Sequence, residues 1–267
     1  MRTSLRTAGL LRLLVIVLGL AASGARAQGQ GVAIRWETCF GEGAAPFARS
    51  FACDTNAGEE RLVGSFVSLT DMSEVTGNEI VIDICTRATR CPPPLWCENT
   101  ALGPCTGSAP IPAWWMFRNP GSCRMSSLTM VLTPDPEPAA CPDWAYGQAV
   151  GGIGAYQIGL GGPQTARLMM VKAVPPSSAA PIAAGAEYFS FALRIRHERT
   201  VGDGACAGCE QPMAIILNSI NLTTPLAENN RRLVGPLNAA DSDFVIWTPV
   251  PVPTRTTTWG AVKSRFR

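Results

Sequence analysis

A period-two alternation of apolar and polar side chains constrains the fold of this chain more than any other feature. Between Tyr188 and Glu198, large apolar residues occupy every second position: Phe189, Phe191, Leu193 and Ile195. This alternation predicts a strand with one buried face and one face toward solvent. Met213–Thr223 begins with five consecutive apolar residues, which is typical of a strand buried on both faces. We therefore expect a β-hairpin whose glycine-rich loop, Gly202–Cys209, is closed by a Cys206–Cys209 bridge.

Several other segments have the composition of short strands. In Asn78–Thr86 three isoleucines lie at alternate positions, and β-branched side chains suit a pleated surface. Further strands are expected at Ala33–Trp36, Arg61–Leu69, Ser127–Thr133, Tyr156–Ile158, Thr165–Val174 and Phe244–Trp247. Loops are expected at Gly41–Asp54, through most of Ala149–Gly162, and at Pro225–Asp243. The sequence therefore predicts an all-β protein, an antiparallel β-sandwich with jelly-roll-like or immunoglobulin-like topology.

Four parts are predicted along the chain. Residues 1–27 have arginines before a short apolar run, Leu13–Leu20, and end in Ala25-Arg26-Ala27, which is the pattern of a cleaved signal peptide. A retained N-terminal anchor is the alternative. Residues 28–247 form the sandwich, with a cysteine- and proline-rich excursion at 85–112. Residues 248–257 are an extended proline-rich linker.

The last part, residues 258–267, is expected to be a short amphipathic C-terminal helix. Trp259, Val262 and Phe266 fall on one face of such a helix. This face would dock either on the sandwich or on a partner protein.

Charge and hydropathy limit the cellular compartments and the classes of partner that suit this chain. After the predicted signal, no stretch is long and apolar enough to span a membrane. The whole chain carries a net charge of +2, and the signal holds four arginines and no acid, which leaves −2 for the mature chain. A nearly neutral chain lacks the basic field that nucleic-acid binding requires. We expect a secreted, cell-surface or periplasmic protein.

Ten cysteines follow the predicted signal, and export into an oxidising space favours five disulfides. Short spacings favour local bridges, so we expect the pairs Cys39–Cys53, Cys123–Cys141 and Cys206–Cys209. The remaining four are expected to pair among themselves: Cys85, Cys91, Cys97 and Cys105. Short loops closed in this way contribute about 2–3 kcal/mol each.

The Cys-x-x-Cys spacing at Cys206 and Cys209 has three functional alternatives. Haem attachment requires a histidine where this chain has Glu210. Zinc needs four ligands, and the chain has one histidine and no second Cys-x-x-Cys. Redox catalysis usually places the pair at the start of a helix, whereas a strand is expected here. A structural disulfide is favoured, with no metal and no cofactor.

His197 is the only histidine, so any histidine-dependent catalysis must use it. Its ordinary pKa suits a general base, but no Gly-x-Ser-x-Gly elbow or comparable nucleophile motif accompanies it. Asp241-Ser242-Asp243 offers two carboxylates to calcium without the EF-hand frame, and a solvated turn is favoured. The glycines of Gly151–Gly162 do not form a phosphate-binding fingerprint. No catalytic residue is assigned.

Aromatic residues are the candidates for ligand binding, because a flat exposed strip can stack on sugar rings. The candidates are Trp96, Trp114, Trp115, Trp144, Tyr146 and Tyr156. In a strand, adjacent Trp114 and Trp115 would point to opposite faces, so one of them at most could serve. Packing in the core is the default for such side chains. A glycan or another surface protein is the partner class that this pattern allows.

Five stretches resemble a group of uncharacterised exported bacterial proteins. They are Asn78–Asp83, Trp114–Asn119, Gly151–Tyr156, Thr200–Cys209 and Thr258–Ser264. The resemblance covers most of the mature chain and implies a coherent family without a known activity. The excursion from Cys85 to Cys105 is longer here than in that group.

Together these observations predict an exported, non-catalytic structural, surface or adhesion module. A carbohydrate-binding module that uses exposed tryptophan is the second hypothesis. A hydrolase that uses His197 is the third.

Overall fold

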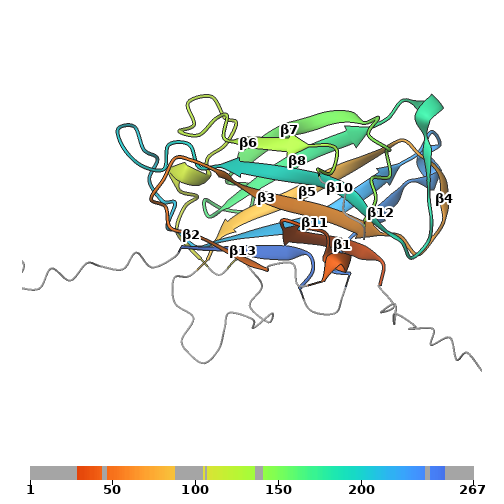
Figure 1. Cartoon of the computed structure of the whole chain (residues 1–267), viewed down its shortest axis with the longest axis horizontal. Coiled ribbons are helices and arrows are strands. Elements are labelled where there is room, and N and C mark those ends of the chain that lie inside the picture. Colours follow the sequence, from red (N-terminus) through yellow and green to blue (C-terminus); the bar gives the residue numbers. More distant parts are fainter. Residues whose placement is uncertain are drawn as a thin grey trace, which may run out of the picture.

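The computed structural model describes residues 29–43, 47–87, 105, 107–135, 141–237 and 241–249. One sheet has four antiparallel strands. In spatial order they are β1 (Gly31–Trp36), β3 (Glu59–Val67), β10 (Glu187–Arg196) and β6 (Leu128–Val131). In Figure 1 the strands of both main sheets run roughly along the long axis of the view.

The second sheet has seven strands. In spatial order they are β2 (Ala48–Phe51), β13 (Phe244–Pro249), β11 (Met213–Thr223), β5 (Gly77–Thr86), β8 (Thr165–Ala173) and β7 (Val150–Ile158), with β12 (Arg231–Leu233) also paired to β11. All pairings are antiparallel except β2 with β13. The prediction of an all-β, antiparallel sandwich is confirmed.

Short elements complete the described part of the chain. Two strands, β4 (Met72–Val75) and β9 (Ala180–Ile182), form a small separate sheet. The helical elements are three-residue 3-10 turns: η1 (Phe40–Glu42), η3 (Ala113–Trp115), η4 (Pro176–Ser178) and η5 (Ala227–Asn229). No helix among the described residues is long and apolar enough to cross a membrane.

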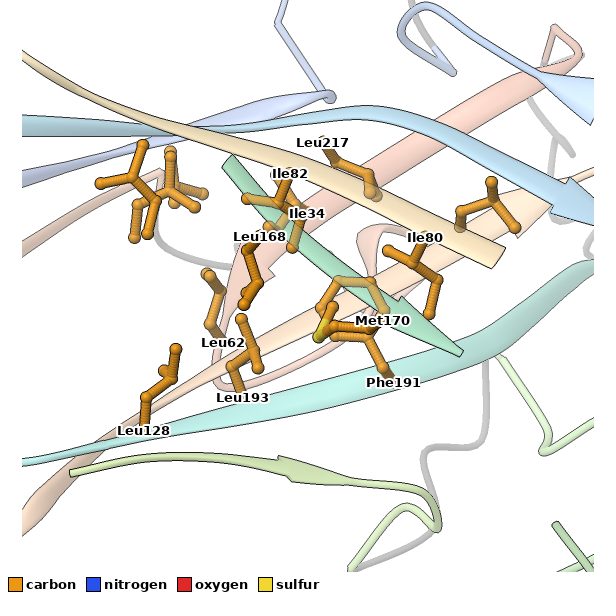
Figure 2. Packing of buried hydrophobic residues seen from close by; sticks show 14 of the residues in the cluster. Ile34, Leu62, Ile80, Ile82, Leu128, Leu168, Met170, Phe191, Leu193 and Leu217 are labelled. Carbon is orange, nitrogen blue, oxygen red and sulfur yellow. The ribbon is translucent and has the colours of Figure 1, made fainter. Parts of the chain in front are cut away.

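The core lies between the two sheets, where alternate side chains of each strand meet (Figure 2). The seven-stranded sheet contributes Ile80, Ile82, Leu168, Met170 and Leu217, and the four-stranded sheet contributes Ile34, Leu62, Leu128, Phe191 and Leu193. All of them are buried. Burying a side chain of this size stabilises the fold by about 1.5–3 kcal/mol relative to leaving it exposed.

The predicted hairpin between β10 and β11 is wrong. β10 pairs with β3 and β6, whereas β11 pairs with β5, β12 and β13 in the other sheet. The connection between them, residues 197–212, therefore passes from one sheet to the other. The alternation identified the buried face of β10 correctly, but it carries no information about which strand lies beside it.

Three strands lie in segments that were expected to be loops. β7 has nine residues instead of the short strand predicted at Tyr156–Ile158, and its glycines join the ladder with β8. β2 lies within the expected loop Gly41–Asp54, and β12 lies within Pro225–Asp243. Strands at or near a sheet edge can form through backbone hydrogen bonds alone, so their side chains show little pattern.

Several predicted features lie outside the described residues. They are the signal peptide, residues 88–104 of the excursion with Cys91, Trp96 and Cys97, residues 250–257 of the linker, and the tail with Trp259, Val262 and Phe266. The first two residues of the predicted linker, Thr248 and Pro249, instead continue β13.

Gly64 of β3 allows the closest approach inside the core. It lies opposite Phe191 in the β3–β10 ladder, and a Cβ at this position would overlap the phenylalanine ring. The absence of a side chain is therefore a packing requirement at this position.

We predict that Gly64→Ala lowers the free energy of unfolding by about 1–3 kcal/mol, because the Phe191 ring must leave its position. Gly154→Ala in β7 is the matched control, since its added Cβ would make an ordinary contact. Urea unfolding of both variants measures the difference. Equal midpoints would contradict the packing.

Candidate functional site

Several of the residues that the sequence singled out, Trp114, Trp115 and His197 among them, gather at one buried group of rings, the aromatic cluster. Its members are Trp36, Phe51, Trp114, Trp115 and Trp247. The ring of Trp247 lies 5.2–6.1 Å, between ring centroids, from the other four. These rings come from β1, β2, η3 and β13, so the cluster joins both sheets and a connecting segment. Trp36, Phe51 and Trp247 were not among the candidate residues from the sequence.

The polar atoms of the cluster are largely hydrogen-bonded inside the protein. Indole N–H groups of Trp247, Trp114 and Trp36 donate to Cys209 O at 3.0 Å, to Thr200 Oγ1 at 3.0 Å and to Ile246 O at 3.2 Å. Tight aromatic pairs add about 0.5–1.5 kcal/mol each beyond the area that they bury. The cluster is therefore part of the core.

The expectation that Trp114 and Trp115 point to opposite faces of a strand is wrong. They lie in η3, both are fully buried, and their rings meet edge to face at 5.2 Å. The hydroxyl of Tyr156 donates to Trp115 O at 2.5 Å, and burial raises the pKa of Tyr156. Trp144 is also buried. Of the proposed sugar platform, only Tyr146 is exposed among the described residues, at 72%.

His197 is buried against the aromatic cluster. Its ring stacks on Phe51 with centroids 3.8 Å apart, and Nδ1 lies 2.8 Å from Ala57 O. Nε2 lies 3.2 Å from Glu60 Oε1, an ion-pair distance without the alignment of a hydrogen bond. Glu60 also accepts from Arg49, whose guanidinium is 3.1 Å from Glu37.

The His197 ring hydrogen-bonds to no hydroxyl or thiol among the described residues. A base must reach the proton of a nucleophile or of a bound water at about 2.6–3.2 Å. Within the described part of the chain, the ring hydrogen-bonds only to a backbone carbonyl. The imidazole is therefore a packing and hydrogen-bonding group at the end of β10.

A cleft of about 480 Å³ opens beside the cluster. Residues 121–127 form one side of it, and Glu198 and Arg199 line the other. Ser127 Oγ donates to Glu198 Oε2 at 3.1 Å. No imidazole stands between this serine and this carboxylate, so the pair lacks the base of a hydrolase triad.

Arg124, at the inner side of the cleft, is a buried cation. Its guanidinium lies 3.5 Å from the centroid of the Trp114 ring, and it donates to Trp114 O at 2.7 Å and to Arg196 O. Burial lowers the pKa of Arg124 to about 9, and the charge of Glu198 opposes this shift. The side chain thereby fastens residues 121–127 to the end of β10.

Two long-range disulfides close this end of the protein. Cys206 pairs with Cys123, and Cys209 pairs with Cys53, across sequence separations of 83 and 156 residues. Together they fasten the connection 197–212 to two remote segments. Cys206 and Cys209 do not pair with each other, so no redox-active Cys-x-x-Cys is formed.

The other two described disulfides are Cys39–Cys141 and Cys85–Cys105. The predicted pairs Cys39–Cys53, Cys123–Cys141 and Cys206–Cys209 are all wrong, whereas Cys85–Cys105 agrees with the predicted local group. Spacing failed as a guide because strands that are adjacent in this sandwich come from distant parts of the chain. No cysteine is free among the described residues.

The side chain of Arg35 contacts the segment Asp241-Ser242-Asp243, which was considered as a possible calcium site. Arg35 Nη2 lies 3.5 Å from Asp241 Oδ1, and Arg35 Nη1 donates to the carbonyls of Asp241 and Ser242 at 3.1 and 3.2 Å. A second group with metal-ligand spacing is Cys39, Cys141 and Glu187. Its two sulfurs are joined in a disulfide, so it offers no thiolate to a metal.

No known protein family, curated protein or solved structure matches the chain. The resemblance to exported bacterial proteins therefore stays a prediction.

We predict that peptide mapping without reduction recovers the Cys53–Cys209 and Cys123–Cys206 pairs. Replacing Cys53 and Cys209 together by serine should cost about 2–5 kcal/mol of unfolding free energy, because a very long loop is no longer closed.

The matched control replaces Cys85 and Cys105, which are 20 residues apart. Its cost should be smaller by about 2 kcal/mol, as expected for the shorter loop. A Cys206–Cys209 peptide, or equal costs for the two double variants, would contradict the structure.

Proposed function

We propose that this protein is an exported, non-catalytic structural or surface module of a bacterium, held together by disulfides. One observation carries this proposal. In the described part of the chain, the cysteines and the histidine, which are the side chains best suited to catalysis, take part in structural contacts of the interior. All eight described cysteines are in disulfides, and His197 is stacked and hydrogen-bonded to the backbone.

The cross-links support a location outside the cytoplasm. Disulfides persist in oxidising compartments and are rare where thiols are kept reduced. Three of those described span 83, 102 and 156 residues, so they remove many conformations from the unfolded chain. Such a chain tolerates exposure to conditions that would unfold an unbraced domain of the same size.

The described contacts give no support to the two alternative functions, sugar binding and hydrolysis. A sugar platform needs exposed rings, and Trp114, Trp115, Trp144 and Tyr156 are buried. A hydrolase of this kind needs a nucleophile hydrogen-bonded to the His197 imidazole, and the described contacts of His197 include none.

Export is tested by expressing the full chain in a bacterium and labelling its thiols with a maleimide polymer. The protein should be recovered outside the cytoplasm, starting near Gln28, with no label before reduction and ten labels after it. A chain that lacks residues 1–27 is the control, and it should stay in the cytoplasm with reactive thiols. Full-length protein with free thiols in the cytoplasm would contradict the proposal.

The absence of His197-dependent catalysis is tested separately with esterase, peptidase and glycosidase substrates. Wild type and His197→Ala should show the same background rate. His197→Ala should lose about 1–3 kcal/mol of unfolding free energy, because the Phe51 stack and the hydrogen bond are removed. Turnover that disappears in a folded His197→Ala protein would overturn the non-catalytic assignment.

A further inference from the structure

A buried lysine and a buried aspartate from different layers of the fold meet in the interior. Lys172 lies on β8 of the seven-stranded sheet, and Asp143 bridges to Phe189 of β10 in the four-stranded sheet. Lys172 Nζ is 2.6 Å from Asp143 Oδ1, and the two side chains are 0% and 4% exposed. The contact therefore connects the two sheets where water does not reach it.

The pair is buried beside two aromatic rings. The Lys172 nitrogen lies 4.9 Å from the centroid of the Phe189 ring and 5.5 Å from that of Trp144. Burial lowers the pKa of Lys172, although the charge of Asp143 opposes this shift. Burial therefore favours the neutral amine of Lys172, which is the form that can act as a nucleophile.

The carboxyl group is held as an acyl acceptor would be. Oδ1 accepts the backbone N–H of Ala145 at 3.0 Å, and Oδ2 accepts that of Gly147 at 2.8 Å. When an amine adds to Cγ of Asp143, negative charge develops on these oxygens. The two N–H groups are already placed to stabilise that charge, as in an oxyanion hole. Oδ1 is bonded to Cγ, so the amine is also close to the carbon that it would attack.

Asn78 supplies a further polar atom beside the lysine. It lies directly opposite Lys172 in the β5–β8 ladder, and its Nδ2 donates to Ser190 Oγ at 2.8 Å. Its buried Oδ1 has no hydrogen-bond partner among the described residues. A buried acceptor without a donor is costly, so this oxygen adds to the polar character of the interior beside Lys172.

We propose that Lys172 and Asp143 condense into an intramolecular amide that covalently joins the two sheets. The ammonium gives one proton to the carboxylate, and the amine then attacks Cγ. A C–N bond forms, a C–O bond breaks, and one water leaves, so no oxidant, reductant or cofactor is required. This link goes beyond the proposed function and does not depend on where the protein acts. Unlike the disulfides, it would survive reduction.

The mass of the full-length, processed protein tests the link directly. After reduction and alkylation, and incubation at neutral pH, the intact mass should be one water, about 18 Da, below the sequence mass. Trypsin should not cut after Lys172, and a branched peptide should contain both Lys172 and Asp143. An unchanged mass with normal cleavage after Lys172 would show an ion pair only and would overturn the proposal.

Two variants separate this link from other losses of water. Lys172→Arg keeps the positive charge but cannot form the amide, so it should have the full mass. Asp143→Asn should release ammonia and give the same linked product as wild type. A succinimide at Asp143 also loses water but leaves Lys172 open to trypsin. If Lys172→Arg does not fold, the wild-type peptide map still decides, and a mass loss that persists in Lys172→Arg contradicts the proposal.

Discussion

The apolar layer between the two sheets is the interaction on which the other features depend. Side chains such as Ile82 and Leu168 meet Leu62 and Leu193 across it, and this contact sets the distance between the sheets. The disulfides become possible because the layer brings remote segments together. Cys53 and Cys209 are 156 residues apart, yet both lie beside the same buried rings. The bridges then reinforce an arrangement that hydrophobic burial has already selected.

The sequence predicted where strands form better than it predicted which strands pair with each other. Alternating residues in β10 and the isoleucines of β5 identified a sandwich, because the side-chain period follows from the strand itself. Strand order depends on packing over the whole chain, so the β10–β11 hairpin and three local disulfides were predicted wrongly. Trp36 and Trp247 were missed for the same reason, since only the fold shows that isolated tryptophans converge.

The functional candidates were also limited by what sequence can show. Their residue types suit catalysis or binding: His197, the Cys-x-x-Cys pair and the adjacent tryptophans. Sequence spacing does not reveal which groups surround such residues in the fold. In the structure, His197 stacks on Phe51 and the two cysteines belong to separate disulfides. The two tryptophans belong to the aromatic cluster. Lys172 and Asp143 were not singled out from the sequence, because charged residues usually face solvent.

Denaturant unfolding of the exported protein, with and without a reductant, tests the central claim most directly. The account predicts one cooperative transition for the oxidised protein, because a single core is shared by both sheets. Reduction should lower the unfolding free energy by several kcal/mol, about 2–5 for each long-range bridge if the losses add. An unchanged midpoint after complete reduction would contradict the claim that these bridges stabilise the fold.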